Sequence, residues 1–583
     1  MVANAELVAA TPGDLVVLDG ETANWRASDG SRRELINTAE AAALQHCATF
    51  APLDFHAQQL ARATGWTPQQ VAGLLAQLAS RGLVRSAAEY LGALDATATA
   101  RVPDPTIVIR AYQRPEGLAV LLDSLLADER RHGARRQYVV VDDTLDDGYA
   151  AKTYGLVRKF AGASASSVRM LGLHERAAAL DEVLAPLANT EREIVAELLD
   201  PARPCALTGS RTWNWAVLLA AGGSLSILDD DTRFPLRTLP ASHRAFDLLD
   251  ATESVVRWFD EPEAPARELP ELDVDPYARL ADWVGQPAQA LLARDGWNDR
   301  TLVHRSPREL AAAARNARVI AAVPGTYGTI TLDSSVYLTY PAESIHDLWR
   351  APYRHARLAS DALAQGYEAP RLTSFALYTP LLVDARELLP FAGTWGRVDD
   401  TYFLMLLRAM APKQAYVHAP LLLGHADFAP RDRLARATGG RIPLDRNAFV
   451  SSLALTLGDV LGGADREARL AAVGASLAAL ATAPDDAIAD LVLRWRTDMT
   501  GRVTRQLDGA LRTRRDAPAE WRAHAERIVK VNRDAIRDDR VEPDEIRASR
   551  AAIAQLAKAA PLWPKLWHHA RELGTAAFAP EAR

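Results

Sequence analysis

Short apolar segments alternate with longer amphipathic ones in the part of the chain that follows residue 105. Thr106–Arg110 and Gln137–Val141 are rich in β-branched residues, which predicts strands, and Glu116–Leu126 between them has helical periodicity. Strands that alternate with helices are typical of a largely parallel, doubly wound sheet, in which ligands bind at the carboxyl ends of the strands. We therefore expect an α/β fold with its site at one edge of the sheet.

The N-terminal segment has a different pattern. Residues 11–20 predict a short strand with Trp25 on a returning strand, and helices are expected at Thr38–Ala48, at Phe55–Ala63 and from the N-cap Thr67 to Ser80. This order predicts a small winged-helix-like module over residues 1–91. The Ala-, Thr- and Pro-rich stretch 92–105 is typical of a linker.

The rest of the chain is mostly helix-patterned. Residues 150–205 and 241–316 predict helices, and two further strands are expected at Gly328–Leu332 and Ser335–Thr339. Residues 106–430 would form the α/β unit and 431–583 a helical C-terminal domain. The expected core anchors of that domain are Trp495, Trp521, Trp563 and Trp567.

Composition narrows the class of protein. A chain of 583 residues is too long for a single core, and a net charge of -7 disfavours broad contact with nucleic acid. No apolar run is long enough to span a membrane and no signal peptide is visible, so a cytoplasmic location is expected. The only two cysteines, Cys47 and Cys205, lie in apolar surroundings and are expected in the core.

The segment from Ser224 to Asp231 is an apolar run that ends on three carboxylates, Asp229, Asp230 and Asp231. A buried carboxylate costs several kcal/mol unless a cation offsets it. A strand that ends in this way therefore predicts a divalent-metal site, although a solvated turn has the same local pattern.

Three more groups add acidic or basic side chains at expected element ends. Asp142 and Asp143 follow the second strand, and Asp399 and Asp400 precede the helix-patterned Leu404–Met410. His425 follows the apolar run that begins at Ala415. Acidic residues also favour the first turn of any helix, and a histidine after a strand is often a packed residue, so these alternatives remain open.

Together these motifs resemble a GT-A fold, family-2-like glycosyltransferase over roughly residues 104–430. The resemblance implies that Ala111, Tyr112 and Arg114 contact the nucleotide and that Asp142 and Asp143 accept hydrogen bonds from base or ribose. Gln113 departs from the family's usual Asn. The Arg-x-x-Asn pattern that begins at Arg211 implies a guanidinium near the base or diphosphate, which suits this always charged, bidentate group.

The same resemblance assigns the chemistry. Asp231 would ligate Mn²⁺ or Mg²⁺ directly, Asp229 or Asp230 would reach metal or ribose, and His425 would join the metal shell. Asp400 would be the catalytic base of an inverting transfer, and Asp399 would orient it or a donor hydroxyl. The donor would be a nucleoside-diphosphate sugar, most often a UDP-sugar.

The N-terminal residues resemble a PqqD-like module, which binds peptides by adding them as a strand to a sheet edge. Residues 1–100 hold ten Asp or Glu against six Arg, which disfavours the rival DNA-binding winged helix. The leading hypothesis is sugar transfer to a peptide or protein acceptor. Two alternatives stay open: the same chemistry on a small-molecule, lipid or polysaccharide acceptor, and a degenerate binding protein.

Overall fold

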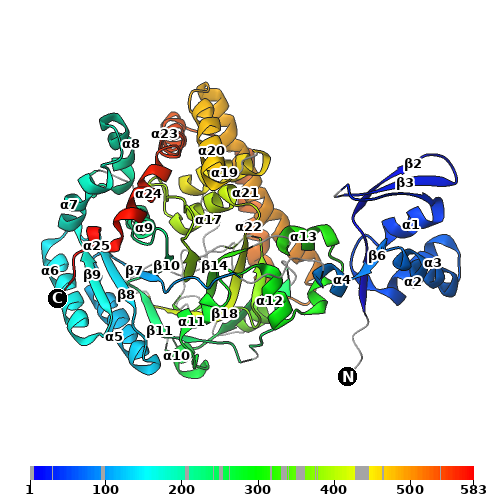
Figure 1. Ribbon diagram of the computed structural model, residues 1–583, viewed down its shortest axis with the longest axis horizontal. Helices are drawn as coiled ribbons and strands as arrows, with labels where there is room; N and C mark the ends of the chain where they lie inside the picture. Colours follow the sequence, from blue (N-terminus) through cyan, green and yellow to red (C-terminus); the bar gives the residue numbers. More distant parts are fainter. Residues whose placement is uncertain are drawn as a thin grey trace.

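The protein has an α/β architecture with one large mixed sheet and a helical C-terminal region, as expected (Figure 1). The computed structural model describes residues 6–28, 30–92, 99–203, 209–240, 242–248, 254–261, 263–314, 318–329, 338, 340–349, 362–374, 376, 379–426, 445–461, 465–538 and 540–582. Cys47 is buried as predicted, and Cys205 lies outside the described residues. In that described part of the chain, no helix is long and apolar enough to cross a membrane.

The large sheet has the order β12-β16-β18-β14-β17-β10-β7-β8-β9. These strands are β12 Asp247–Leu248, β16 Arg371–Thr373, β18 Ala415–His425, β14 Val319–Thr329, β17 Leu382–Asp384, β10 Ser224–Asp229, β7 Thr106–Ala111, β8 Gln137–Asp142 and β9 Ser167–Leu171. Outside this path, β11 Thr232–Arg237 pairs with β18, and β15 Ala362–Gly366 joins β14 to β13 Val255–Trp258. The four strands β10, β7, β8 and β9 are parallel to one another.

Both faces of the parallel strands are covered, because their side chains alternate between two hydrophobic cores. Val108 and Val139 lie in one core, and Ile107 and Val140 lie in the other. The helices between the strands are α5 Pro115–His132, α6 Asp147–Ala163, α7 Leu173–Val183, α8 Asn189–Leu199 and α9 Gly209–Leu219. The strands predicted at Thr106–Arg110 and Gln137–Val141 are confirmed, and the helix predicted at Glu116–Leu126 is α5, which extends beyond both ends of the prediction.

Several predicted elements are corrected. The helical prediction for 150–205 missed strand β9, and the helical prediction for 241–316 missed strands β12 and β13. The helices in the second segment are short: α10 Ala264–Glu268, α11 Pro276–Ala281, α12 Ala288–Asp295 and α13 Pro307–Ala314. The strand expected at Gly328–Leu332 is the end of β14, which begins at Val319. Residues 330–332 and most of 335–339 lie outside the described residues.

Several of the C-terminal helices share a hydrophobic core with the α/β unit. The C-terminal helices are α19 Arg446–Val460, α20 Arg466–Ala481, α21 Asp485–Thr513, α22 Ala519–Asp538, α23 Pro543–Ala559, α24 Trp563–Leu573 and α25 Thr575–Phe578, and α17 Asp399–Met410 precedes them within the α/β unit. Trp563 and Trp567 are buried in one core with Trp213 of α9. Beyond α25, Ala582 donates its backbone N–H to Val168 O of β9 at 3.0 Å, so the chain end runs along the sheet edge.

The N-terminal residues form the predicted strands and helices, and they stand beside the α/β unit in Figure 1. A meander of β2 Gly13–Val17, β3 Thr22–Ala27 and β4 Arg33–Asn37 precedes α1 Thr38–His46, α2 Leu53–Thr64 and α3 Pro68–Ser80. A second small sheet contains β1 Leu7–Ala10, β5 Ala51–Pro52 and β6 Val84–Ser86, and α4 Ala87–Gly92 follows. Thr67 caps α3 through a capping box with Gln70, as predicted for that N-cap.

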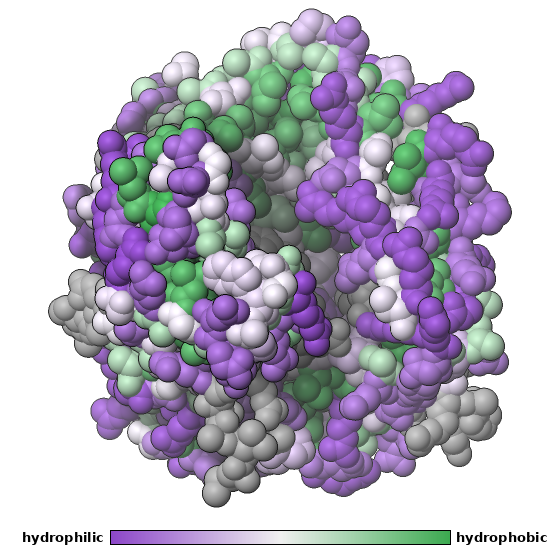
Figure 2. Space-filling view, turned by 90° about the vertical axis from the view of Figure 1, so that its right-hand side faces the viewer, coloured by the Kyte–Doolittle hydropathy of each residue, from purple (hydrophilic) through white to green (hydrophobic). Residues whose placement is uncertain are grey.

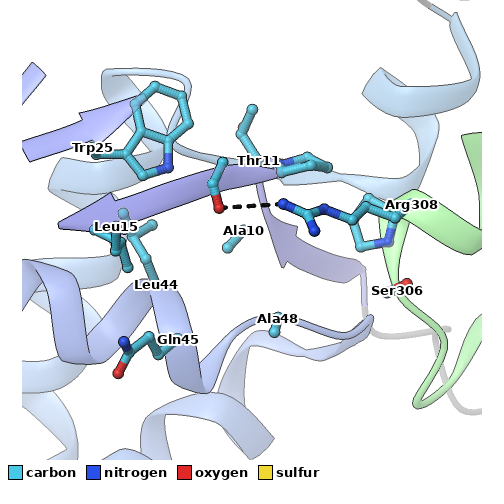
Figure 3. A pocket seen from close by; sticks show the side chains of 12 residues that line it. Ala10, Thr11, Leu15, Trp25, Leu44, Gln45, Ala48, Ser306 and Arg308 are labelled. Atoms are coloured by element: carbon cyan, nitrogen blue, oxygen red, sulfur yellow. Dashed lines mark hydrogen bonds between the residues drawn. The ribbon is translucent and has the colours of Figure 1, made fainter. Parts of the chain in front are cut away.

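Backbone hydrogen bonds attach this N-terminal unit to the α/β unit. Phe50 donates to Arg305 O at 2.7 Å, and His304 donates to Phe50 O at 2.8 Å. A cavity of about 330 Å³ lies at this junction, lined by Leu15, Trp25, Leu44 and Arg308 among others (Figure 3). Residues 93–98 of the predicted linker lie outside the described residues, whereas Thr99 is bound to Gly285 O at 2.7 Å.

The shared core gives a stability prediction. Trp563 is fully buried and its indole N–H donates to Leu389 O at 2.8 Å, so Trp563→Ala should lower the free energy of unfolding by about 3–5 kcal/mol. Urea unfolding followed by circular dichroism measures this, with the exposed Trp66→Ala as the matched control. A separate early transition confined to part of the helix signal would contradict a shared core.

Candidate functional site

The site lies where the order of the parallel strands reverses. The first four strands of the large sheet along the chain are β7, β8, β9 and β10. In space they lie in the order β9-β8-β7-β10, so the chain crosses from one side of β7 to the other between β9 and β10. In sheets of this kind, ligands bind at the carboxyl ends of the strands beside the switch between the first and fourth. The register pairs Arg110 at the end of β7 with Asp229 at the end of β10, so both side chains lie at this switch point.

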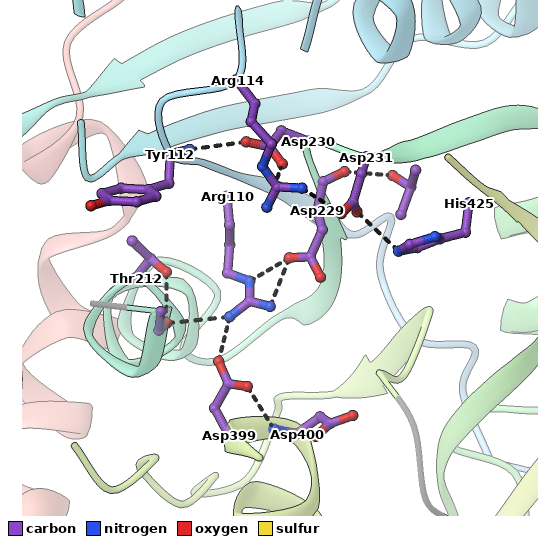
Figure 4. Close-up of polar contacts among 12 residues, drawn as sticks. Arg110, Tyr112, Arg114, Thr212, Asp229, Asp230, Asp231, Asp399, Asp400 and His425 are labelled. Atoms are coloured by element: carbon purple, nitrogen blue, oxygen red, sulfur yellow. Dashed lines mark hydrogen bonds and ion pairs between the residues drawn. The ribbon is translucent and has the colours of Figure 1, made fainter. Parts of the chain in front are cut away.

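The three consecutive aspartates have different partners (Figure 4). Asp229 Oδ1 accepts from Arg110 Nε at 2.7 Å. Asp230 is only 2% exposed, and it accepts the backbone N–H of Tyr112 at 2.9 Å while its second oxygen lies 3.2 Å from Arg114 Nη2. Asp231 Oδ2 accepts from Arg114 Nη1 at 2.6 Å. Each carboxylate thus has an arginine partner, which offsets the cost of burial.

The three carboxyl groups differ in pKa. Burial raises the pKa of Asp229 above its ordinary value and raises the pKa of Asp230 to about 7. Burial alone would also raise the pKa of Asp231, but His425 and Arg114 outweigh it and hold that pKa well below its ordinary value. Asp231 is therefore the member of the triplet most firmly ionised at neutral pH.

His425, at the end of β18, lies on the other side of Asp231. Its Nε2 is 3.5 Å from Asp231 Oδ1, and its Nδ1 lies 2.5 Å from Thr329 O. Burial opposes protonation, but the charge and hydrogen bond of Asp231 outweigh it, so the pKa of His425 is raised. The structure thus brings together Asp231 and His425 as the sequence predicts, whereas His418 of the same strand packs against Tyr367, with ring centroids 5.0 Å apart.

Asp399 and Asp400 begin α17, and Asp399 faces the triplet across Arg110 (Figure 4). Arg110 Nη1 donates to Asp399 Oδ2 at 2.5 Å, so this guanidinium connects the two acidic groups. Asp400 accepts the backbone N–H of Thr401 at 2.6 Å, and none of the ion pairs found among the described residues includes it. Burial, followed by the charge of Asp399, raises the pKa of Asp400 to about 6.

Asp142 and Asp143 lie at the end of β8, next to β7. Asp142 Oδ1 accepts from the N–H and hydroxyl of Thr144 at 3.0 and 2.6 Å, and burial raises its pKa. Asp143 is paired with the fully buried Arg176, which also donates to Asp142 O at 2.9 Å. The carbonyl of Ala111 accepts the N–H of Asp143 at 3.0 Å, so the ends of β7 and β8 are fixed together.

Arg211 is not among the groups that the site brings together. It is buried on α9, where Nη1 donates to Arg203 O at 2.5 Å and Nε to Glu197 O at 3.4 Å. Backbone carbonyls near the end of α8 hold this side chain, so the structure does not bring Arg211 together with the aspartates of the site, and its role near a diphosphate stays a prediction. The guanidinium that contacts the acidic groups of the site is that of Arg110, and its sequence signal is a charged residue within a β-branched strand.

Gln113 adopts an unusual backbone conformation in the turn after β7. Its φ is +52°, in the left-handed region that Asn tolerates better than most residues. The N–H of Gln113 donates to Thr144 Oγ1 at 2.9 Å. Tyr112, in the turn after β7, is 40% exposed and lies beside the acidic cluster.

The donor set for a metal ion is small. Within the part of the chain that the structure describes, no cluster of three or more His, Cys, Asp or Glu side chains is arranged to hold one. Asp231 Oδ1 is buried, and His425 Nε2 lies 3.5 Å from it, which leaves one carboxylate oxygen and one imidazole for an ion. Such a pair fits an ion that takes its remaining ligands from phosphates and water.

Protonation of Asp230 gives a pH-dependent stability prediction. Its raised pKa means that the folded state keeps the proton between about pH 4 and 7, where the unfolded chain releases it, so the contribution of Asp230 to stability falls as pH rises through this range. Asp230→Asn cannot ionise and should gain stability relative to wild type by about 1.4 kcal/mol per pH unit there, and level off above pH 7.

Urea unfolding at pH 4, 5.5, 7 and 8 measures this difference. Asp181→Asn, at a side chain that is 96% exposed, is the matched control and should show no such trend. A difference between Asp230→Asn and wild type that is constant with pH would contradict the assignment of a retained proton to Asp230.

Comparisons with known proteins give no relative for this chain. A scan against models of protein families found no match, and searches of curated proteins and of solved structures found none either. Its function is therefore inferred from the chemistry of its own site.

Proposed function

We propose that this chain is a metal-dependent, inverting glycosyltransferase of the GT-A type that uses a nucleoside-diphosphate sugar. One observation carries the proposal: acidic groups from residues 142–143, 229–231 and 399–400 converge at the carboxyl ends of the strands at the switch point. A site with this many carboxylates and two arginines suits a phosphate-bearing ligand that arrives with a cation.

The nucleoside end of the donor fits the β7–β8 side of the site. The exposed ring of Tyr112 offers a face for stacking a base. Asp142 and Asp143 at the neighbouring strand end supply carboxylate oxygens that can accept hydrogen bonds from base or ribose hydroxyls. Arg176 and Thr144 already fix these two carboxylates, so little ordering is required when a nucleoside binds.

The diphosphate end fits the β10 side. Breaking the glycosidic bond leaves a nucleoside diphosphate with increased negative charge, which Arg110 and Arg114 at the triplet can stabilise. Asp231 and His425 would hold a divalent ion, whose Lewis acidity would add to that stabilisation when it is bound. Asp229 and Asp230 are engaged with the arginines and thus orient them.

Asp400 is the group best suited to take the proton from the acceptor hydroxyl. Its pKa of about 6 leaves it ionised at neutral pH yet basic enough for proton transfer. In an inverting transfer, the acceptor oxygen loses its proton to Asp400 as it attacks the anomeric carbon from the face opposite the leaving diphosphate. Asp399 is paired with Arg110 and is therefore a weaker proton acceptor than Asp400.

A peptide or protein acceptor is supported by the N-terminal unit. Strand β2 is an edge strand, and Val16, Val17 and Leu18 are more than half exposed (Figure 2 shows the side of the molecule that carries this unit). On β4, the other edge strand of the meander, Glu34 is paired with Arg81 at 2.8 Å. An extended peptide would therefore pair with β2 and place a side chain in the adjoining cavity of Figure 3.

Donor hydrolysis tests the metal assignment. Asp231→Asn keeps the side-chain volume but removes the charge, so Mn²⁺- or Mg²⁺-dependent hydrolysis of UDP-sugars should fall by about 10²–10³-fold. Release of UDP from a panel of UDP-sugars is the measurement, and the exposed Asp181→Asn is the control. Full turnover by Asp231→Asn would exclude Asp231 as a metal ligand, and no hydrolysis by wild type with any nucleotide sugar would favour the binding-protein alternative.

Removal of residues 1–91 distinguishes a peptide acceptor from a small-molecule, lipid or polysaccharide acceptor. The catalytic groups all lie beyond residue 105, so the shortened chain should keep donor hydrolysis within about threefold of wild type while it loses transfer to a peptide acceptor. Circular dichroism and UDP release are measured first, followed by transfer to the peptide. Unchanged transfer would indicate a small-molecule, lipid or polysaccharide acceptor and a structural role for the N-terminal unit.

A further inference from the structure

We infer that Arg110 is the positioning residue that gives the adjacent carboxylates of α17 different roles: it binds Asp399 and leaves Asp400 free to accept a proton. This inference rests on the proposed function for the identity of the base. The ion pair itself can be measured without any turnover.

The guanidinium of Arg110 has partners on several sides. Its Nε and Nη2 each lie 2.7 Å from Asp229 Oδ1, and its Nη1 lies 2.5 Å from Asp399 Oδ2 and 3.2 Å from Gly209 O. The ring of Trp213 lies 5.0 Å from the guanidinium carbon. One side chain therefore connects the end of β7 to the end of β10 and to the start of α9 and α17 (Figure 4).

The surroundings allow little freedom to this guanidinium. Arg110 is 14% exposed and Asp399 17% exposed, so their ion pair is largely shielded from water. Gly209 allows the close approach of α9, because a Cβ at that position would lie 3.3 Å from Asp399 Oδ2 and 3.6 Å from Arg110 Nη1. A shielded pair with several fixed contacts holds its geometry better than an exposed one.

Asp400 has a different environment although it is the next residue. Its carboxylate accepts a backbone N–H from Thr401, and its own N–H donates to Asp399 Oδ1 at 3.3 Å. Arg110 thus fixes Asp399, and Asp399 in turn contacts the backbone of Asp400. The proton-accepting oxygens of Asp400 are left without a cation among the residues that the structure describes.

Charge neutralisation explains why this division matters. The ionised groups that face Asp400 are Asp399, Arg110 and Asp229, and the first and third disfavour its ionisation while Arg110 favours it. Without Arg110, the two neighbouring carboxylates would repel each other, and Asp400 would hold its proton to higher pH. The base would then be protonated where the wild type is active.

Four variants test the inference through the pH dependence of kcat/KM for donor turnover. Arg110→Gln should move the acidic limb of the profile upward by about one pH unit, which is about a tenfold loss on that limb. Adding Asp399→Asn to Arg110→Gln removes the repelling charge and should move the limb back toward wild type. Arg110→Lys keeps the charge, so its limb should stay in place even where its turnover falls.

The surface variant Arg131→Gln is the matched control, because Arg131 pairs with exposed carboxylates far from the site in sequence. An unmoved limb in Arg110→Gln overturns the inference, as does a limb that Asp399→Asn fails to restore. A purely structural role for Arg110 would lower turnover without this reversal by Asp399→Asn.

A double-mutant cycle on urea midpoints separates this inference from the proposed function. Arg110→Gln and Asp399→Asn should shift the midpoint non-additively, because each removes the same contact. If the shifts are non-additive and no nucleotide sugar is turned over, the ion pair stands and the glycosyltransferase proposal fails. If turnover occurs and the shifts are additive, the positioning role of Arg110 is wrong and the proposed function stands. Arg110→Lys replaces Arg110→Gln in the cycle if Arg110→Gln does not fold.

Discussion

The structure of the site depends on how buried negative charge is offset. Asp229, Asp230, Asp231 and Asp399 crowd one edge of the sheet, and an unpaired buried carboxylate costs several kcal/mol. Arg110 and Arg114 offset this charge, and both come from the end of β7 and the turn after it. The parallel pairing of β7 with β10 is what brings these arginines to the triplet, so the topology and the electrostatics require each other.

Local periodicity was enough to predict the elements that carry most of the site. The strands at β7, β8 and β18 have long β-branched or apolar runs, and the sequence predicted them within a residue or so. By contrast, β12 and β13 span two and four residues, too few for a period to be visible. The start of β14 was missed because Pro324 and Gly325 interrupt it, and these residues normally indicate a turn.

Side-chain direction was less predictable than element position. The sequence placed Arg211 at the donor site, but its long side chain is bound by carbonyls near the end of α8, which come together with α9 only in the tertiary fold. Arg110 had no predicted role, because its partners Asp229 and Asp399 lie 119 and 289 residues away. Local sequence carries no information about contacts at such separations.

The C-terminal helices influence the site through α9. Asn214 of this helix donates to Leu198 O and Ala392 O and accepts the N–H of Ala392 at 2.6 Å, which ties α9 to the segment before α17. Trp563 donates to Leu389 O in the same segment and shares a core with Trp213, the ring beside Arg110. The helices that cover α9 thereby hold the arginine and the start of α17 in register. The site keeps Asp231 ionised while the pKa values of Asp230 and Asp400 are raised. This difference depends on the fixed positions of Arg110 and Arg114, because displacing either arginine would make the pKa values of the carboxyl groups more alike.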